Sequence, residues 1–374
     1  MNPDTVNSEH TTGGAVELID HHCHPVVLAA LERPEFEGLL NEAAGPAAGT
    51  SLFDSMLGLA IRRWCAPVLG LAPNADPDEY LHRRRDLGPE ASRRLLAEAG
   101  LTHLLVDTGI ADPRLCDLDQ LSGLAGARTY EVLRLETLVE SLLAAGTDVV
   151  DLPGQVERTL RDTTAVAAKS IAAYRVGLDL PDRKPAEPAL VAALSRCRAA
   201  GRTRRLADPV VSGWLAWTAL EAGLPLQLHT GLGDADLDLH RADPLLLTPF
   251  LRATEALGPA VLLLHSYPFQ RSAGYLSQVY GHVFCDVGLA VHNTGAFSAT
   301  VIRELLEVAP FGKVLFSTDA YGLAELFLVG SFLFRRGLAL VLGELTAAGE
   351  LDPADAERIT GMITSENARR VYRL

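Results

Sequence analysis

The stretch that decides the fold is PLQLHTGLGDADLDLHRADPLLLTPFLRATEALGPAVLLLHSYP, residues 225–268. It begins with a short apolar run through His229, continues as an amphipathic helical pattern that ends at Gly258, and returns to a second apolar run through His265. Continuous apolar runs are typical of parallel strands that helices cover on both faces. A glycine commonly ends a helix. The stretch therefore predicts one β-α-β unit.

The same alternation runs through the whole chain. Eight strands, each followed by a helix, is the count of a (β/α)8 TIM barrel, which is an α/β fold. An open doubly wound sheet is the alternative, but its first turn needs glycines where this sequence has HHCHPVV. The eight predicted strands are residues 17–24, 103–110, 128–136, 165–173, 225–231, 260–268, 282–290 and 313–322.

The connection between the first two strands is out of proportion to the others. Residues 25–102 separate them, where a short loop and one helix would suffice. The segment is largely helical in pattern. We expect a helical insertion that acts as a lid over the site or joins the subunits of a homo-oligomer. Residues 1–15 are expected to be a disordered tail, and residues 16–374 a single domain.

Composition limits the classes of function. The net charge of −14 argues against a general nucleic-acid binder. Five cysteines without a CxxC pair indicate reduced thiols in a cytoplasmic protein. The polar N-terminus predicts no signal peptide, and the apolar stretch 326–342 is interrupted by Arg335 and Arg336. We expect a small-molecule substrate and no nucleic-acid or membrane partner.

Histidines gather where the predicted strands end, which is the catalytic face of a barrel. His22 and His24 are two apart on the first strand and share a face, whereas His21 is expected to point to the other side. The fifth and sixth strands end at His229 and His265. Asp319 ends the eighth strand. Four histidines and an aspartate at one rim of the barrel predict a divalent-metal site.

Lys169 lies in the apolar fourth strand, AVAAKSIAA, and is one of only three lysines. A lone buried ammonium is costly. Three interpretations remain open: Lys169 neutralises a carboxylate, acts as a Schiff-base or general-base lysine, or carries CO2 as a carbamate that bridges two metal ions.

The order of these residues resembles the amidohydrolase superfamily, in its two-metal subtype. The sequence around these residues is similar to that of the amidohydrolase-2 branch, which includes the N-terminal domain of FluG-type and nodulin-like proteins. The resemblance covers roughly residues 17–374. The segments that carry it are KSIAAYRVGL (169–178), LHTGLGDADLDL (228–239), LLHSYPFQRSAGYL (264–276), FSTDAYGLAELFLVGS (316–331) and SENARRVYRL (365–374).

The resemblance implies a role for each residue. His22 and His24 would hold one metal, and His229 and His265 the second. Lys169, as a carbamate formed with CO2, would bridge them. Asp319 would bind the first metal and, as the catalytic residue, transfer the proton. The metal is expected to be zinc, with manganese or iron as alternatives, at one or two ions per chain.

Substrate contacts are expected from side chains near the same strand ends. Arg175 could hold a substrate carboxylate in a bidentate manner, and a surface salt bridge is its alternative interpretation. Tyr174, Tyr267 and His292 follow the fourth, sixth and seventh strands.

Two enzymatic functions and one non-enzymatic function follow. The first is a metal-dependent amidohydrolase that cleaves an amide or related C–N bond of a small polar metabolite, with γ-glutamyl amides as a candidate class. The second is a single-metal decarboxylase or lyase of the same superfamily. Lys169 favours the first, because one metal needs no bridging carbamate. A binding protein on a retained barrel is the third, and the intact set of ligands argues against it.

Overall fold

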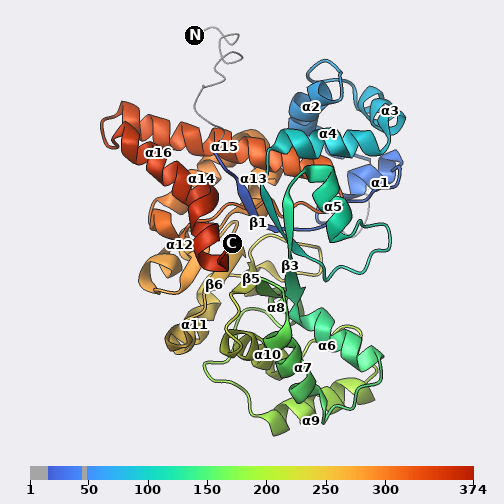
Figure 1. The fold of residues 1–374 in the computed structure, drawn as a ribbon, viewed down its shortest axis with the longest axis vertical. Helices are drawn as coiled ribbons and strands as arrows, with labels where there is room; N and C mark the ends of the chain where they lie inside the picture. The colour runs from blue at the N-terminus through green and yellow to red at the C-terminus, as the bar shows by residue number, and fades with distance from the viewer. Residues whose placement is uncertain (1–15, 44–48) are drawn as a thin grey trace.

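Seven parallel strands form one sheet in chain order (Figure 1). The structure is a computed structural model, and it describes residues 16–43 and 49–374. The predicted tail, residues 1–15, therefore lies outside the described residues. The strands are β1 Ile19–Cys23, β2 His103–Asp107, β3 Arg128–Arg134, β4 Ala167–Ser170, β5 Leu226–Thr230, β6 Val261–His265 and β7 Val283–Cys285.

The eighth element, predicted as a strand over residues 313–322, is an irregular segment. Val314 makes an isolated parallel bridge to Cys285 at the end of β7. On its other side, the Phe316 carbonyl accepts a hydrogen bond from the His21 amide (3.1 Å) in β1. The segment thus lies between β7 and β1 and completes a TIM barrel. It departs from regular strand geometry at Asp319, whose φ of 52° breaks the extended backbone.

Burial on both faces explains the continuous apolar runs. In β6, Leu262 and Leu264 point into the barrel, whereas Val261 and Leu263 belong to the outer core under the helices. Tyr372 joins the inner core from the last helix. The helices after β2 are α5 Leu118–Ala125, α6 Leu135–Ala144, α7 Leu152–Asp162, α8 Ala172–Arg175, α9 Glu187–Ala199, α10 Pro209–Glu221, α11 Thr248–Thr254, α12 Gln270–Val279, α13 Gly288–Thr294, α14 Ser298–Leu306, α15 Ala324–Ala347, α16 Pro353–Gly361 and α17 Asn367–Tyr372.

The long connection between β1 and β2 is helical, as expected. Its helices gather beside α15 (Figure 1). Glu325 of α15, fully buried, accepts hydrogen bonds from Arg84 Nε (2.6 Å) and Tyr80 Oη (2.9 Å) of this connection. A buried carboxylate is stable only with such partners, so this ion pair fixes the segment to the barrel. The helices are α1 Arg33–Gly38, α2 Met56–Val68, α3 Pro77–Leu87 and α4 Pro89–Ala99.

Helix α15 is longer than the apolar stretch that the sequence suggested. By length and composition this 24-residue helix could cross a membrane, contrary to the expectation for residues 326–342. However, 67% of its most apolar window is buried inside the protein. Packing in the outer core therefore accounts for its apolar composition.

Candidate functional site

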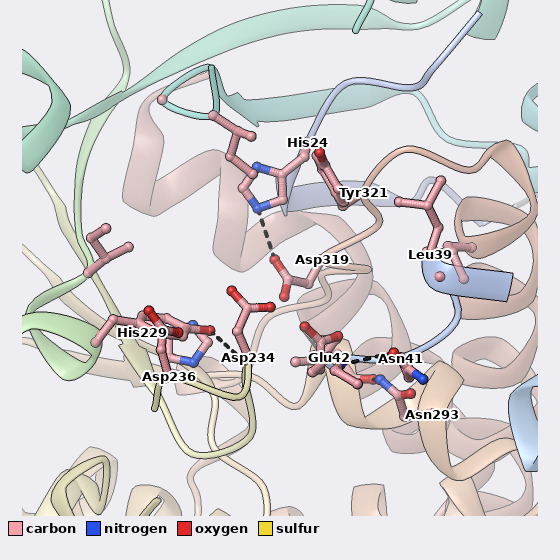
Figure 2. A pocket seen from close by; sticks show the side chains of 18 of the residues that line it. His24, Leu39, Asn41, Glu42, His229, Asp234, Asp236, Asn293, Asp319 and Tyr321 are labelled. Carbon is pink, nitrogen blue, oxygen red and sulfur yellow. Dashed lines mark hydrogen bonds and ion pairs between the residues drawn. The ribbon is translucent and has the colours of Figure 1, made fainter. Parts of the chain in front are cut away.

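A cavity of about 490 Å³ lies at the carboxyl ends of the strands. Figure 2 shows side chains from several strand ends and from the loop after α1 around it. Most of the predicted site residues meet here, and His22 and His265 lie fully buried beneath its wall. The predicted residues that line the cavity are His24, Lys169, Tyr174, Arg175, His229, His292 and Asp319.

Asp319 lies at the centre of a cluster of imidazoles. Its Oδ1 is 3.2 Å from Nε2 of His22 and 3.3 Å from Nε2 of His24, and its Oδ2 is 3.4 Å from Nε2 of His265. The ring centroids of His229 and His265 are 4.8 Å apart. The chain thus brings together all four predicted histidine ligands and the predicted carboxylate.

Several atoms of the cluster that could bind a metal are buried without a hydrogen bond. Among the described residues these are Nε2 of His229, Nε2 of His265 and Oδ1 of Asp319. Buried polar atoms without partners are rare, so each needs an explanation. Imidazole nitrogens and carboxylate oxygens are ligands of zinc and related ions. His22, His265 and Asp319 each offer one such atom within 4.8 Å of the others, and the set therefore fits a divalent metal.

Two hydrogen bonds orient the imidazoles at the carboxyl end of β1. Nδ1 of His22 lies 2.8 Å from Oε1 of Gln227, and Nδ1 of His24 lies 3.2 Å from the carbonyl oxygen of Asp107. A proton on each Nδ1 would leave Nε2 as a free electron-pair donor toward the cavity. Gln227 is itself held, because its Nε2 donates to Tyr372 Oη at 2.9 Å.

The side chain of His21 does not point out of the barrel, contrary to the expectation from strand alternation. Its Nδ1 lies 2.9 Å from Tyr372 Oη, and its Nε2 lies 2.8 Å from a carboxylate oxygen of Asp286. The other oxygen of Asp286 accepts from the His265 amide at 2.9 Å. The register of β1 shifts between Asp20 and Cys23, and such an irregularity interrupts the two-residue period.

Lys169 is buried beside the imidazoles. Its Nζ lies 3.2 Å from Nε2 of His22. In the described part of the chain no carboxylate oxygen comes within salt-bridge distance of Nζ, so this lysine forms no direct ion pair there. Burial lowers the pKa of Lys169 to about 8. At neutral pH a larger fraction of this amine is therefore neutral and nucleophilic than in an ordinary lysine.

The protonation states match those that a cation requires. Burial lowers the pKa of His22 to about 3 and that of His265 to about 4. Burial opposes ionisation of Asp319, but the nearby imidazoles, His265 first, outweigh it and hold its pKa well below the usual range. At neutral pH His22 and His265 are therefore neutral and Asp319 is ionised, the forms that bind metal.

The backbone is unusual where it presents these groups. His265 has φ 70° and Asp319 has φ 52°, in the left-handed region that non-glycine residues rarely adopt. Such conformations are concentrated at functional sites, where the surrounding structure holds them in place. Gly233 passes so close to Tyr174 that a Cβ atom there would clash with the phenol and lie 2.8 Å from Nε2 of His229.

The predicted substrate contacts divide into two groups. Tyr174, Arg175 and His292 line the cavity, whereas Tyr267 is absent from its lining among the described residues. Arg175 pairs with Glu140 (3.2 Å) through Nη2, so the surface salt bridge proposed as its alternative is in fact a buried one. Its Nε and Nη1 are buried and have no hydrogen-bond partner in the part of the chain that the structure describes.

Several residues of the site were not predicted, among them Asp107, Arg134, Gln227 and Glu42. Asp107 and Arg134 end β2 and β3 and form a buried ion pair (2.7 Å), and the rule of strand ends could have found them. Gln227 lies inside β5, where its polarity in an apolar run was the signal. Glu42 lines the cavity from the loop after α1, and no sequence pattern marked it.

Comparisons with known proteins agree on the family and fold. Residues 19–374 match the family model described as amidohydrolase. The chain is 27% identical to protein FluG of Emericella nidulans over 96% of its own length, but spans only 46% of FluG. A structure assigned as a metal-dependent hydrolase from Lactobacillus casei is 26% identical, with a TM-score of 0.82 over 96% of this chain and 95% of that one. A uronate isomerase of Thermotoga maritima, 13% identical over 96% of this chain and 94% of its own, shares the fold (TM-score 0.62).

Proposed function

The chain belongs to the amidohydrolase family, and from this premise we propose that it hydrolyses an amide or related C–N bond of a small polar metabolite. That it is a metal-dependent enzyme of this superfamily follows from the family match and from the fit of the donor set. The observation that carries the proposal of hydrolysis is Lys169, which is buried beside His22 and forms no ion pair with a carboxylate of residues 16–43 and 49–374. The cavity of about 490 Å³ suits a small ligand.

In this proposal the donor set holds two ions, most simply zinc. His22 and His24 would hold one, His229 and His265 would hold the other, and Lys169, as a carbamate, would be a ligand shared by both. When bound, such ions polarise the scissile carbonyl and lower the pKa of the attacking water.

The chain's own groups then perform the remaining chemistry. Asp319 accepts the proton of the water and passes it to the leaving nitrogen. Its low pKa keeps it ionised and ready as an acceptor at neutral pH. The free N–H groups of Arg175 bind a carboxylate of the substrate, which fits a γ-glutamyl amide.

A single-metal lyase is the second candidate. The close spacing of the ligands favours it, because Nε2 of each of His22, His24 and His265 lies 3.2–3.4 Å from a carboxylate oxygen of Asp319. One ion could take all four groups. We therefore test the proposed function by counting ions and products.

The purified protein is expected to contain about two divalent ions per chain and to release an amine or ammonia from an amide panel that includes γ-glutamyl amides. Chelation should abolish turnover, and zinc should restore it. Elemental analysis and product assays measure this. One ion per chain, with CO2 release and no amide cleavage, would establish the lyase instead.

Gln227 should support the metal through His22. Gln227→Leu removes the acceptor of the imidazole Nδ1 proton and is expected to weaken metal affinity by about 10- to 100-fold. Competition with a chromogenic chelator measures this directly, without an activity assay.

Tyr372→Phe is the matched control, because it removes a partner of Gln227 but leaves the bond to His22 (2.8 Å) in place. It should change metal affinity much less. Equal affinity in wild type and Gln227→Leu would show that this bond does not position the ligand.

A further inference from the structure

Two further carboxyl groups line the same cavity as the imidazole cluster. Glu42 lies in the loop after α1, and Asp234 lies in the loop after β5 (Figure 2). The loops are joined, because the amide of Ala235 donates to the Glu42 carbonyl at 2.9 Å. The long β1–β2 connection thus contributes an acidic side chain directly to the cavity.

Neither carboxylate has a cationic partner among the described residues. By contrast, Asp236 on the same loop forms an ion pair with Arg205. Burial and the nearby Asp234 carboxylate raise the pKa of Glu42 to about 9. Two carboxylates held close together cannot both ionise without a compensating cation.

A second observation shows that the same cavity is built for a polar ligand. The side chain of Arg175 is only 8% exposed, yet its Nε and Nη1 have no hydrogen-bond partner among residues 16–43 and 49–374. Nδ1 of His292, a residue 2% exposed, also has no partner within these ranges. Unpartnered buried donors and acceptors are rare in native structures, so a ligand with several polar groups accounts for them.

We propose that Glu42 and Asp234 bind a primary ammonium group of the substrate, so that the substrate carries an amine besides its scissile bond. An ammonium supplies three hydrogen-bond donors and the positive charge that the pair lacks. A further metal ion there is disfavoured, because in the described part of the chain neither residue belongs to a group of three or more side chains that could hold one. This inference rests on the proposed function, of which it specifies the substrate class.

The test compares two probes that differ only in the ammonium group, L-glutamate and glutarate. Isothermal titration of the metal-loaded protein at neutral pH should show L-glutamate binding about 10- to 100-fold more tightly, the range for hydrogen bonds to a charged group. Glu42→Gln and Asp234→Asn should each reduce that ratio about tenfold or more, while the affinity for glutarate stays within about threefold.

Asp238→Asn is the matched control. It makes the same change on the same loop, but Asp238 is 65% exposed and absent from the cavity lining. Its preference for L-glutamate should equal that of wild type, and melting temperatures check that all variants fold.

Two results would overturn the inference: equal binding of both probes by wild type, absence of binding included, or a preference that survives in both Glu42→Gln and Asp234→Asn. Titration needs no turnover, so its outcome is separate from the proposed reaction. Amide hydrolysis without an ammonium preference would contradict only the amine site. A preference without hydrolysis would contradict only the reaction.

Discussion

Lys169→Ala is expected to lower kcat/KM for the cognate amide by at least about a thousandfold, equivalent to about 4 kcal/mol of barrier. The change removes the group proposed to lie between the two ions, so the metal content should fall with activity. Steady-state kinetics and elemental analysis of the same preparation measure both quantities. Bicarbonate or short carboxylic acids, added with divalent metal, should restore part of the activity by supplying a carboxylate in the space left by the side chain.

Lys169→Arg is the matched control. It retains the positive charge but cannot form the carbamate, so it should be as inactive as the alanine variant. Wild-type turnover in Lys169→Arg would refute the carbamate.

The carbamate itself should depend on pH in a defined direction. Free amine reacts with CO2 and the ammonium does not, and burial lowers the pKa of Lys169 to about 8. At fixed bicarbonate concentration, the carbamate formed at equilibrium should therefore increase as the pH rises toward 8 and level off above it. Carbon-13 NMR after incubation with labelled bicarbonate detects it, with Lys169→Arg as the blank.

Asp319→Asn is expected to lower kcat by about a thousandfold. The amide cannot accept the proton of the attacking water, and it is a poorer ligand than the carboxylate. Asparagine is well suited as a test, because it tolerates the left-handed backbone of φ 52° at this position. Loss of activity can therefore be assigned to chemistry rather than to strain.

The measurements are kcat, metal content and melting temperature. The fold and at least one ion should be retained, because the imidazoles of β1, β5 and β6 remain. More than about a tenth of wild-type kcat in Asp319→Asn would show that another group transfers the proton.

The sequence predicted the barrel and the convergence of the site well, because both depend on strand ends. Parallel strands place their carboxyl ends at one rim, so His22, His229, His265 and Asp319 could be brought together without coordinates. The role of each residue as a metal ligand stays a prediction.

The rest depended on features that periodicity cannot show. The shift in β1 keeps His21 inside the barrel, although simple alternation placed it outside. The positive φ at Asp319 makes the eighth element irregular. Glu42 reaches the cavity from a loop whose path is set by packing of the long connection, and Tyr267 follows β6 but misses the cavity lining.

The hydrogen bonds of Tyr372 have a consequence for the order of events during synthesis. Its hydroxyl group contacts both His21 and Gln227, and Gln227 in turn holds His22. The first strand leaves the ribosome some 350 residues before this tyrosine. A nascent chain can thus display the His22 and His24 pair early, but Gln227 gains its bond to Tyr372 only when residue 372 has emerged. Metal captured before then would meet an incomplete network of hydrogen bonds around these ligands.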